Sequence, residues 1–138
     1  MRQRSPFKLV RQILKEALTV CIFIDEIQES ILYDKHDIPD IKLRLAKKVV
    51  KNFLKRLKES EYFTLKDSHG ETYYKRIQDH LESNHHIHDS TAVYLTYIQM
   101  QIHDFARHFL PNTIGHGGYR RNPEKVSYYK PILEVLTR

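Results

Sequence analysis

The sequence predicts a single domain, residues 1–138, that is mainly α-helical and contains one β-hairpin. Apolar residues recur at helical spacing over three long segments, residues 6–33, 41–58 and 90–110. A shorter segment, residues 61–77, alternates apolar and polar residues around a group of turn formers, which is typical of a hairpin. A chain of 138 residues ordinarily forms one domain.

The composition narrows the class of partner. The chain has 23 Lys and Arg residues against 17 Asp and Glu, a formal net charge of +6. Such a balance favours polyanions: nucleic acid, an acidic protein face or an anionic membrane surface. Cys21 is the only cysteine, which excludes an internal disulfide and a Cys-based zinc cluster. No apolar run is long enough to span a membrane and no leader cleavage site is visible. We therefore expect no membrane partner and an intracellular protein, cytoplasmic or nuclear.

A long first helix is expected from residue 6 to about Tyr33. Ser5 is suited to cap it and Pro6 to occupy its first turn. The residues that keep apolar helical spacing are Phe7, Val10, Ile13, Leu14, Ala17, Leu18, Cys21, Ile24, Ile27, Ile31 and Leu32. Because this apolar arc is wide, the helix is expected to be central or partly within a subunit interface.

Within this helix, Cys21–Glu26 (CIFIDE) resembles the strand and acid pair that hold Mg²⁺ in P-loop ATPases. That chemistry also needs a glycine-rich phosphate loop upstream, and residues 1–20 contain no glycine. The helical spacing runs through the segment without a break. We therefore interpret it as a helix turn that carries two surface acids, Asp25 and Glu26.

The segment Ile41–Lys58 predicts a second helix with two chemically different sides. Its apolar face is formed by Leu43, Leu45, Ala46, Val49, Val50, Phe53, Leu54 and Leu57. A separate arc, about 100° wide at helical spacing, carries Arg44, Lys47, Lys48, Lys51, Lys55 and Lys58. The segment contains no acid, whereas a merely solvated face usually mixes Glu with Lys. A polyanion-binding surface is therefore expected, and a solvated basic face is the alternative.

Residues 61–77 predict the hairpin. Phe63 and Leu65 alternate with polar neighbours, Asp67–Gly70 supplies turn residues, and Thr72–Tyr74 is rich in strand formers. A basic helix followed by such a hairpin resembles the end of a winged-helix DNA-binding domain, where a recognition helix precedes a two-stranded wing. The residues that match the packing positions of that pattern are Leu54, Leu57, Phe63, Gly70, Tyr73 and Tyr74.

The resemblance covers about a quarter of the chain, and the basic helix is long for that family. It implies duplex DNA as the partner. Lys outnumbers Arg six to two within residues 41–58. Because Lys acts mainly as a point charge on phosphate, we expect salt-sensitive binding dominated by the nucleic-acid backbone.

The rest of the chain predicts a loop over residues 81–90 and a third long helix. Asp89 or Ser90 is suited to cap this helix, which should end near Leu110, before Pro111. Its expected apolar face is formed by Tyr94, Leu95, Ile98, Ile102, Phe105, Ala106 and Phe109. Three further apolar residues lie off that face and suggest a second contact: Val93, Tyr97 and Met100.

Residues 112–122 predict an irregular loop, followed by a short helix from Pro123 to about Tyr129 that Pro131 ends. The apolar run ILEVL then predicts a last helical turn or two, docked on the domain or swapped onto a partner. We expect a homodimer through the first helix or these C-terminal turns.

The loop GHGGYRR is a second candidate for polyanion contact. Its glycines, Gly115, Gly117 and Gly118, would let backbone N–H groups approach a phosphate. Two neighbouring cations, Arg120 and Arg121, add charge, and Tyr119 would stack on a base. A solvated loop is the alternative.

Histidines gather in two places. His85, His86 and His88 precede Asp89, and a second group, His103, Asp104 and His108, lies on the third long helix. A zinc site needs three or four ligands, which here would come from separate segments, and no His-Glu-x-x-His motif is present. Polar loop residues, surface pairs or a pH-responsive patch are the simpler interpretation.

Catalytic candidates are few. His103 and Arg107, one helical turn apart, would be the pair for a metal-independent nuclease. Cys21 lies on an apolar helix face, where a thiol is usually an inert filler. The sequence therefore favours a protein without catalytic residues, metal or cofactor.

Taken together, these patterns favour a non-enzymatic nucleic-acid-binding protein, a regulator or accessory factor, with duplex DNA preferred over RNA. The predicted contacts are Arg44, Lys47, Lys48, Lys51, Lys55, Lys58, Tyr119, Arg120 and Arg121. Two alternatives stay open. One is a helical interaction module whose basic face docks an acidic partner protein, and the other is a His-based metal site or nuclease.

Overall fold

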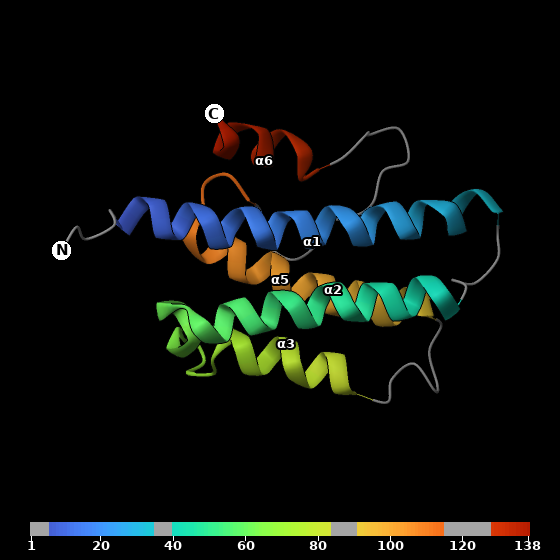
Figure 1. Ribbon diagram of the computed structural model, residues 1–138, viewed down its shortest axis with the longest axis horizontal. Helices are drawn as coiled ribbons and strands as arrows, with labels where there is room; N and C mark the ends of the chain where they lie inside the picture. The colour runs from blue at the N-terminus through green and yellow to red at the C-terminus, as the bar shows by residue number, and fades with distance from the viewer. Residues whose placement is uncertain (1–5, 35–39, 84–90, 115–127) are drawn as a thin grey trace.

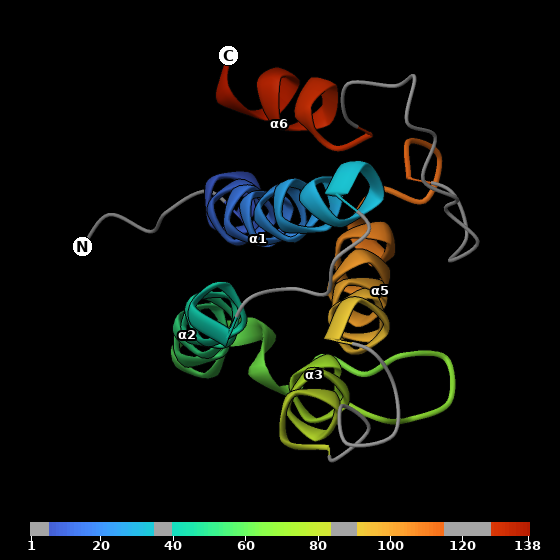
Figure 2. The same ribbon diagram turned by 90° about the vertical axis from the view of Figure 1, so that its right-hand side faces the viewer.

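Four helices form the body of the protein: α1 (Pro6–Asp34), α2 (Asp40–Glu59), α3 (Tyr73–Glu82) and α5 (Thr91–Phe109). The computed structural model describes residues 6–34, 40–83, 91–114 and 128–138, with the side chains of residues 10–28 in α1. Neighbouring helices contact one another in a ring, α1 with α2, α2 with α3, α3 with α5 and α5 with α1. Consecutive helices run in opposite directions (Figure 1), and seen nearly end-on they surround one core (Figure 2).

The core is one continuous apolar cluster to which all four helices contribute residues. The longest contribution comes from α1, with Ile13, Leu14, Ala17, Leu18, Val20, Cys21, Ile24 and Ile27 buried. On α5 the buried apolar residues are Tyr94, Leu95, Ile98, Ile102, Phe105 and Ala106, whereas Val93, Tyr97 and Met100 are exposed. The mainly helical class and the three long helices predicted from apolar spacing are thus confirmed.

The predicted β-hairpin over residues 61–77 is wrong. A short 3₁₀ helix, η1 (Glu61–Thr64), replaces its first arm, and the described residues contain no strand. A single antiparallel bridge joins Lys66 to Thr72 around the predicted turn. In that turn the Asp67 carboxylate accepts hydrogen bonds from the N–H groups of His69 and Glu71, and Gly70 has φ +85°. Without a wing, the winged-helix resemblance is not supported.

The second arm of the expected hairpin is instead the first turn of α3. Thr72 caps this helix, since its hydroxyl accepts from the Lys75 N–H at 3.2 Å. Tyr73, Ile77 and Leu81 follow at four-residue intervals and are all buried in the core. Burial at helical spacing therefore outweighs the local strand preference of the Thr-Tyr-Tyr run.

The interpretation of Asp25 and Glu26 as two surface acids is half right. Both residues lie on α1, which removes any resemblance to an ATPase strand. Glu26 is exposed, but Asp25 is buried at 9% exposure and accepts a hydrogen bond from Gln99 at 2.8 Å. Gln99 also donates to the Cys21 carbonyl, so this amide ties α5 to α1.

The last helix, α6 (Lys130–Thr137), packs along α1 on the side away from α2 and α3 (Figure 2). Pro131 lies in its first turn, so this proline begins a helix where the sequence predicted that it would end one. Ile132, Leu133 and Leu136 pack against the core of their own chain. The helix predicted from Pro123 falls largely outside the described residues, and the homodimer stays a prediction.

Within the described part of the chain, no helix combines the length and apolar character that crossing a bilayer requires.

Candidate nucleic-acid interface

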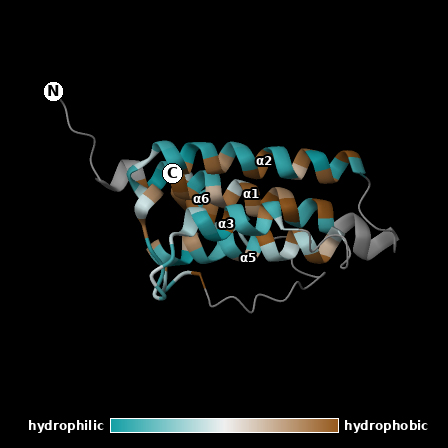
Figure 3. Cartoon of the chain, turned by 90° about the horizontal axis from the view of Figure 1, so that it is seen from below, coloured by the Kyte–Doolittle hydropathy of each residue, from teal (hydrophilic) through white to brown (hydrophobic). Residues whose placement is uncertain are grey.

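The candidate interface is a straight line of cations along the outer side of α2. Ala46, Val50, Phe53, Leu54 and Leu57 are buried and fix the rotation of this helix against α1 and α3. The opposite side carries Arg44, Lys48, Lys51, Lys55 and Lys58, all exposed, which we call the cation row. Figure 3 shows the long hydrophilic stretches of α2, interrupted by brown at its apolar positions.

The row is regular because its members follow one another at intervals of four, three, four and three residues. Residues three and four apart are neighbours on a helix surface. From Arg44 to Lys58 the row is about 21 Å long at 1.5 Å per residue, or about 5 Å per charge. These are the five residues of the predicted set that the structure places together.

The cation row has no acidic partner among the described residues. The ion pairs of the described residues join Arg56 to Glu16, Lys75 to Glu71, Arg76 to both Asp67 and Asp104, and Lys130 to Glu26. Neighbouring like charges on a helix repel one another slightly. The positive potential of the row is therefore left to solvent or to an external anion.

Lys47, also predicted as a phosphate contact, has a different environment. It is half-buried at the edge of the arc, and its Nζ lies 5.4 Å from the centre of the Tyr94 ring. Burial raises the pKa of Tyr94 to about 12, so the ring carries no charge of its own. A cation over an aromatic face is stabilised by the ring quadrupole, and Lys47 therefore packs against the domain.

Leu45 departs from the predicted apolar face of the basic helix. It is 48% exposed, and Ile41 one turn earlier is 72% exposed. Both lie beside the N-terminal half of the cation row. The angular spacing placed Leu45 at the edge of the apolar arc, where only the position of the neighbouring helix decides whether a side chain is covered.

The sequence reasoning missed the groove between α1 and α2, which has a volume of about 390 Å³. Asn52 and Arg56 line it from α2, and Lys15 and Glu16 line it from α1. Arg56 is not among the cations of the predicted arc, and its guanidinium donates to the Glu16 carboxylate. Forty residues separate these partners, so no local sequence signal could have found the pair.

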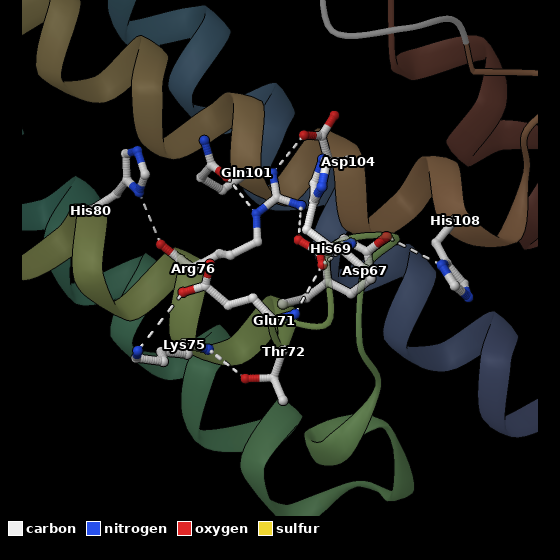
Figure 4. A network of polar contacts seen from close by, with 11 residues as sticks. Asp67, His69, Glu71, Thr72, Lys75, Arg76, His80, Gln101, Asp104 and His108 are labelled. Atoms are coloured by element: carbon white, nitrogen blue, oxygen red, sulfur yellow. Dashed lines mark hydrogen bonds and ion pairs between the residues drawn. The ribbon is translucent and has the colours of Figure 1, made fainter.

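A second cleft, about 930 Å³ in volume, lies where the Asp67 turn and α3 meet α5. At its base Arg76 donates to Asp67 at 3.2 Å, to Asp104 at 2.7 Å and to Gln101 at 2.6 and 2.9 Å (Figure 4). The hydrogen bond from the Glu71 N–H lowers the pKa of Asp67, and the His69 N–H and Arg76 lower it further. Burial of the carboxyl acts in the opposite direction but is outweighed. The charged groups at the base of the cleft, Arg76, Asp67 and Asp104, therefore pair with one another.

The second group of histidines is divided between the core and this cleft. His103 is only 2% exposed, and its Nδ1 lies 2.9 Å from the Tyr129 hydroxyl. A ring so deeply buried is poorly placed to meet a substrate, which weighs against the nuclease pair of His103 and Arg107. His108 is exposed, and its Nδ1 lies 3.1 Å from the Tyr73 hydroxyl. Burial raises the pKa of that phenol.

Within the described residues, no three His, Cys, Asp or Glu side chains gather as a metal site. His85, His86, His88 and Asp89 lie outside those residues, as does the predicted loop contact of Tyr119, Arg120 and Arg121. Burial raises the pKa of the Cys21 thiol, which agrees with its interpretation as an inert core residue.

Comparison of the chain with known protein families, curated proteins and solved structures finds no match, and the function has to be inferred from the chemistry of its own surfaces.

Proposed function

We propose that this protein binds nucleic acid through the cation row of α2, as a non-enzymatic regulator or accessory factor. One observation carries the proposal: five exposed cations lie in line on a helix whose other side is buried in the core, and no described acid forms an ion pair with them. A rigid row of this kind fits the regular charge of a phosphate backbone.

Duplex DNA is the preferred partner. Proteins that bind single strands commonly stack bases on exposed aromatic rings. Phe53 is the one aromatic residue of α2, and it is 2% exposed. The row therefore offers charge without a stacking surface, which suits the paired phosphates of a duplex and gives little sequence discrimination by itself.

The test is fluorescence anisotropy with a labelled duplex across a salt series. Five phosphate contacts predict a slope of about −4.5 for log K against log salt concentration on duplex DNA. Loss of contacts one by one, as in Lys51→Ala and Lys55→Ala, should reduce the slope by about one each. Absence of binding at low salt, or binding that ignores salt, would end the proposal.

A second candidate is an interaction module for an acidic protein. Ile41 and Leu45 favour it, because two exposed apolar side chains beside a cation row would suit a partner with both carboxylates and an apolar anchor. Ile41→Ser/Leu45→Ser discriminates the two functions. The double variant should keep its affinity for duplex DNA and its salt slope if nucleic acid is the partner, whereas docking of an acidic protein should weaken strongly.

A further inference from the structure

The groove between α1 and α2 combines an apolar floor with a polar rim. Val20 and Phe53 are buried at its base beside the half-buried Val49. The rim is formed by Gln12, Lys15, Glu16, Thr19, Asn52 and Arg56. At about 390 Å³ the groove lies at the small end of the range usual for ligand pockets, so it suits a small group with both apolar and polar surface.

The groove and the cation row share a border. Asn52 comes four residues after Lys48 and three before Lys55, so these side chains are neighbours on the helix surface. Asn52 and Lys48 are both exposed, as is Arg56 at 62% of its side chain. A chain of phosphates that follows the row therefore runs past the mouth of the groove.

The rim contains two cations, Lys15 and Arg56, and one anion, Glu16. Glu16, 17% exposed at its side chain, accepts from Arg56 and also lies 3.5 Å from the Gln12 amide nitrogen. Because Glu16 takes up the charge of Arg56, Lys15 is the one cation among the described rim residues that is left to attract a phosphate. Two amides, a hydroxyl and the guanidinium instead supply donors and acceptors together, which is what the edge of a neutral nucleobase requires.

We propose that the α1–α2 groove is a site for one unpaired nucleobase whose flanking phosphates lie on the cation row. This inference rests on the proposed function, because the row delivers the nucleic acid to the groove. Flipped or unpaired bases are held in this way, by hydrogen bonds to their edge and by apolar contact with their faces. Recognition would then depend on the shape of the DNA, with unpaired nucleotides preferred over uninterrupted duplex.

The experiment compares three labelled duplexes of one sequence by anisotropy: fully paired, with one bulged purine, and with an abasic nucleotide at the bulge. The abasic DNA separates base binding from the flexibility that any bulge gives a duplex. The bulged purine should bind on the order of tenfold more tightly than the abasic bulge. Equal affinity for these two DNAs would overturn the base site while leaving backbone binding intact.

Two variants localise the effect. Asn52→Ala removes an amide from the rim, and Thr19→Trp fills the groove; both positions are exposed, so neither change disturbs the core. Each should remove most of the preference for the bulged purine and leave the affinity and salt slope for paired duplex unchanged. A preference that survives in both variants would place the base elsewhere and overturn the inference. If none of the three DNAs binds wild-type protein, the proposed function itself fails.

Discussion

The cation row of α2 and the arginine between α3 and α5 use the same charge in opposite ways. Arg76 is 19% exposed at its side chain and is neutralised by Asp67 and Asp104, with Gln101 as a further acceptor. The row is exposed, and none of the ion pairs among the described residues includes one of its members. A charge that is withdrawn from water must be paired, so Arg76 belongs to the fold.

The largest loss of stability is expected on substitution of Arg76. Arg76→Met keeps much of the side-chain volume but leaves Asp67 and Asp104 without their cation. The free energy of unfolding should fall by about 3 kcal/mol, since breaking a largely buried pair strands its partner charges. Urea denaturation measures this loss. Lys51→Ala in the row should change stability by less than about 0.5 kcal/mol; an equal loss at both positions would contradict the distinction.

The reverse experiment targets the row. Lys51→Glu/Lys55→Glu should weaken duplex binding about a hundredfold at low salt and lower the salt slope by at least about two. Unfolding should be nearly unaffected. The matched control, Lys66→Glu/Lys75→Glu, makes the same change in net charge with exposed lysines outside α2. Comparable weakening by the control would mean that net charge, and not the row, governs binding.

A pH series sharpens the contrast at Asp67. Its pKa is lowered chiefly by the Glu71 N–H, together with the His69 N–H and Arg76. A carboxyl with a lowered pKa in the folded state stabilises the protein above its ordinary pKa of about 3.9 and loses that effect as the pH falls through the folded value. Asp67→Asn should therefore be less stable than wild type at pH 7, by less than Arg76→Met.

The gap between Asp67→Asn and wild type should narrow below about pH 4. Urea denaturation from pH 7 to pH 2 measures it. A gap that stays constant over this range would show that the carboxylate charge contributes nothing to the turn.

The smallest effect is expected at Lys47, which lies between the two regions. Lys47→Ala removes the contact with the Tyr94 ring and should cost about 0.5 kcal/mol of stability. It should weaken duplex binding less than Lys51→Ala does. If anisotropy gives Lys47→Ala the larger loss of affinity, Lys47 belongs to the binding surface as the sequence predicted.

Much of the molecule follows from apolar spacing alone. The bounds of α2 and α5 agree closely with the predicted segments, because a helix that must bury one side repeats that requirement every turn. The turn at Asp67–Gly70 was also predictable, since its conformation depends on short-range hydrogen bonds and on a glycine with positive φ.

The failures occur where local preference and burial disagree. Thr72–Tyr74 has the composition of a strand, yet Tyr73 enters the core together with Ile77 and Leu81, and only a helix brings the three to one side. The prediction at Pro131 failed for a similar reason. A proline is compatible with either the end of one helix or the start of another, and the packing of α6 on α1 selects the start.

The amino-acid sequence by itself determined that six cations share one arc of a helix, because a periodic pattern needs no knowledge of the neighbours. Tertiary structure decided which of the charged side chains form ion pairs within the protein and which remain available to a partner. Arg56 meets Glu16 across 40 residues and Arg76 meets Asp104 across 28, whereas no described acid forms an ion pair with the row. Pairing between distant segments is set by how helices pack, and helical periodicity contains no information about it.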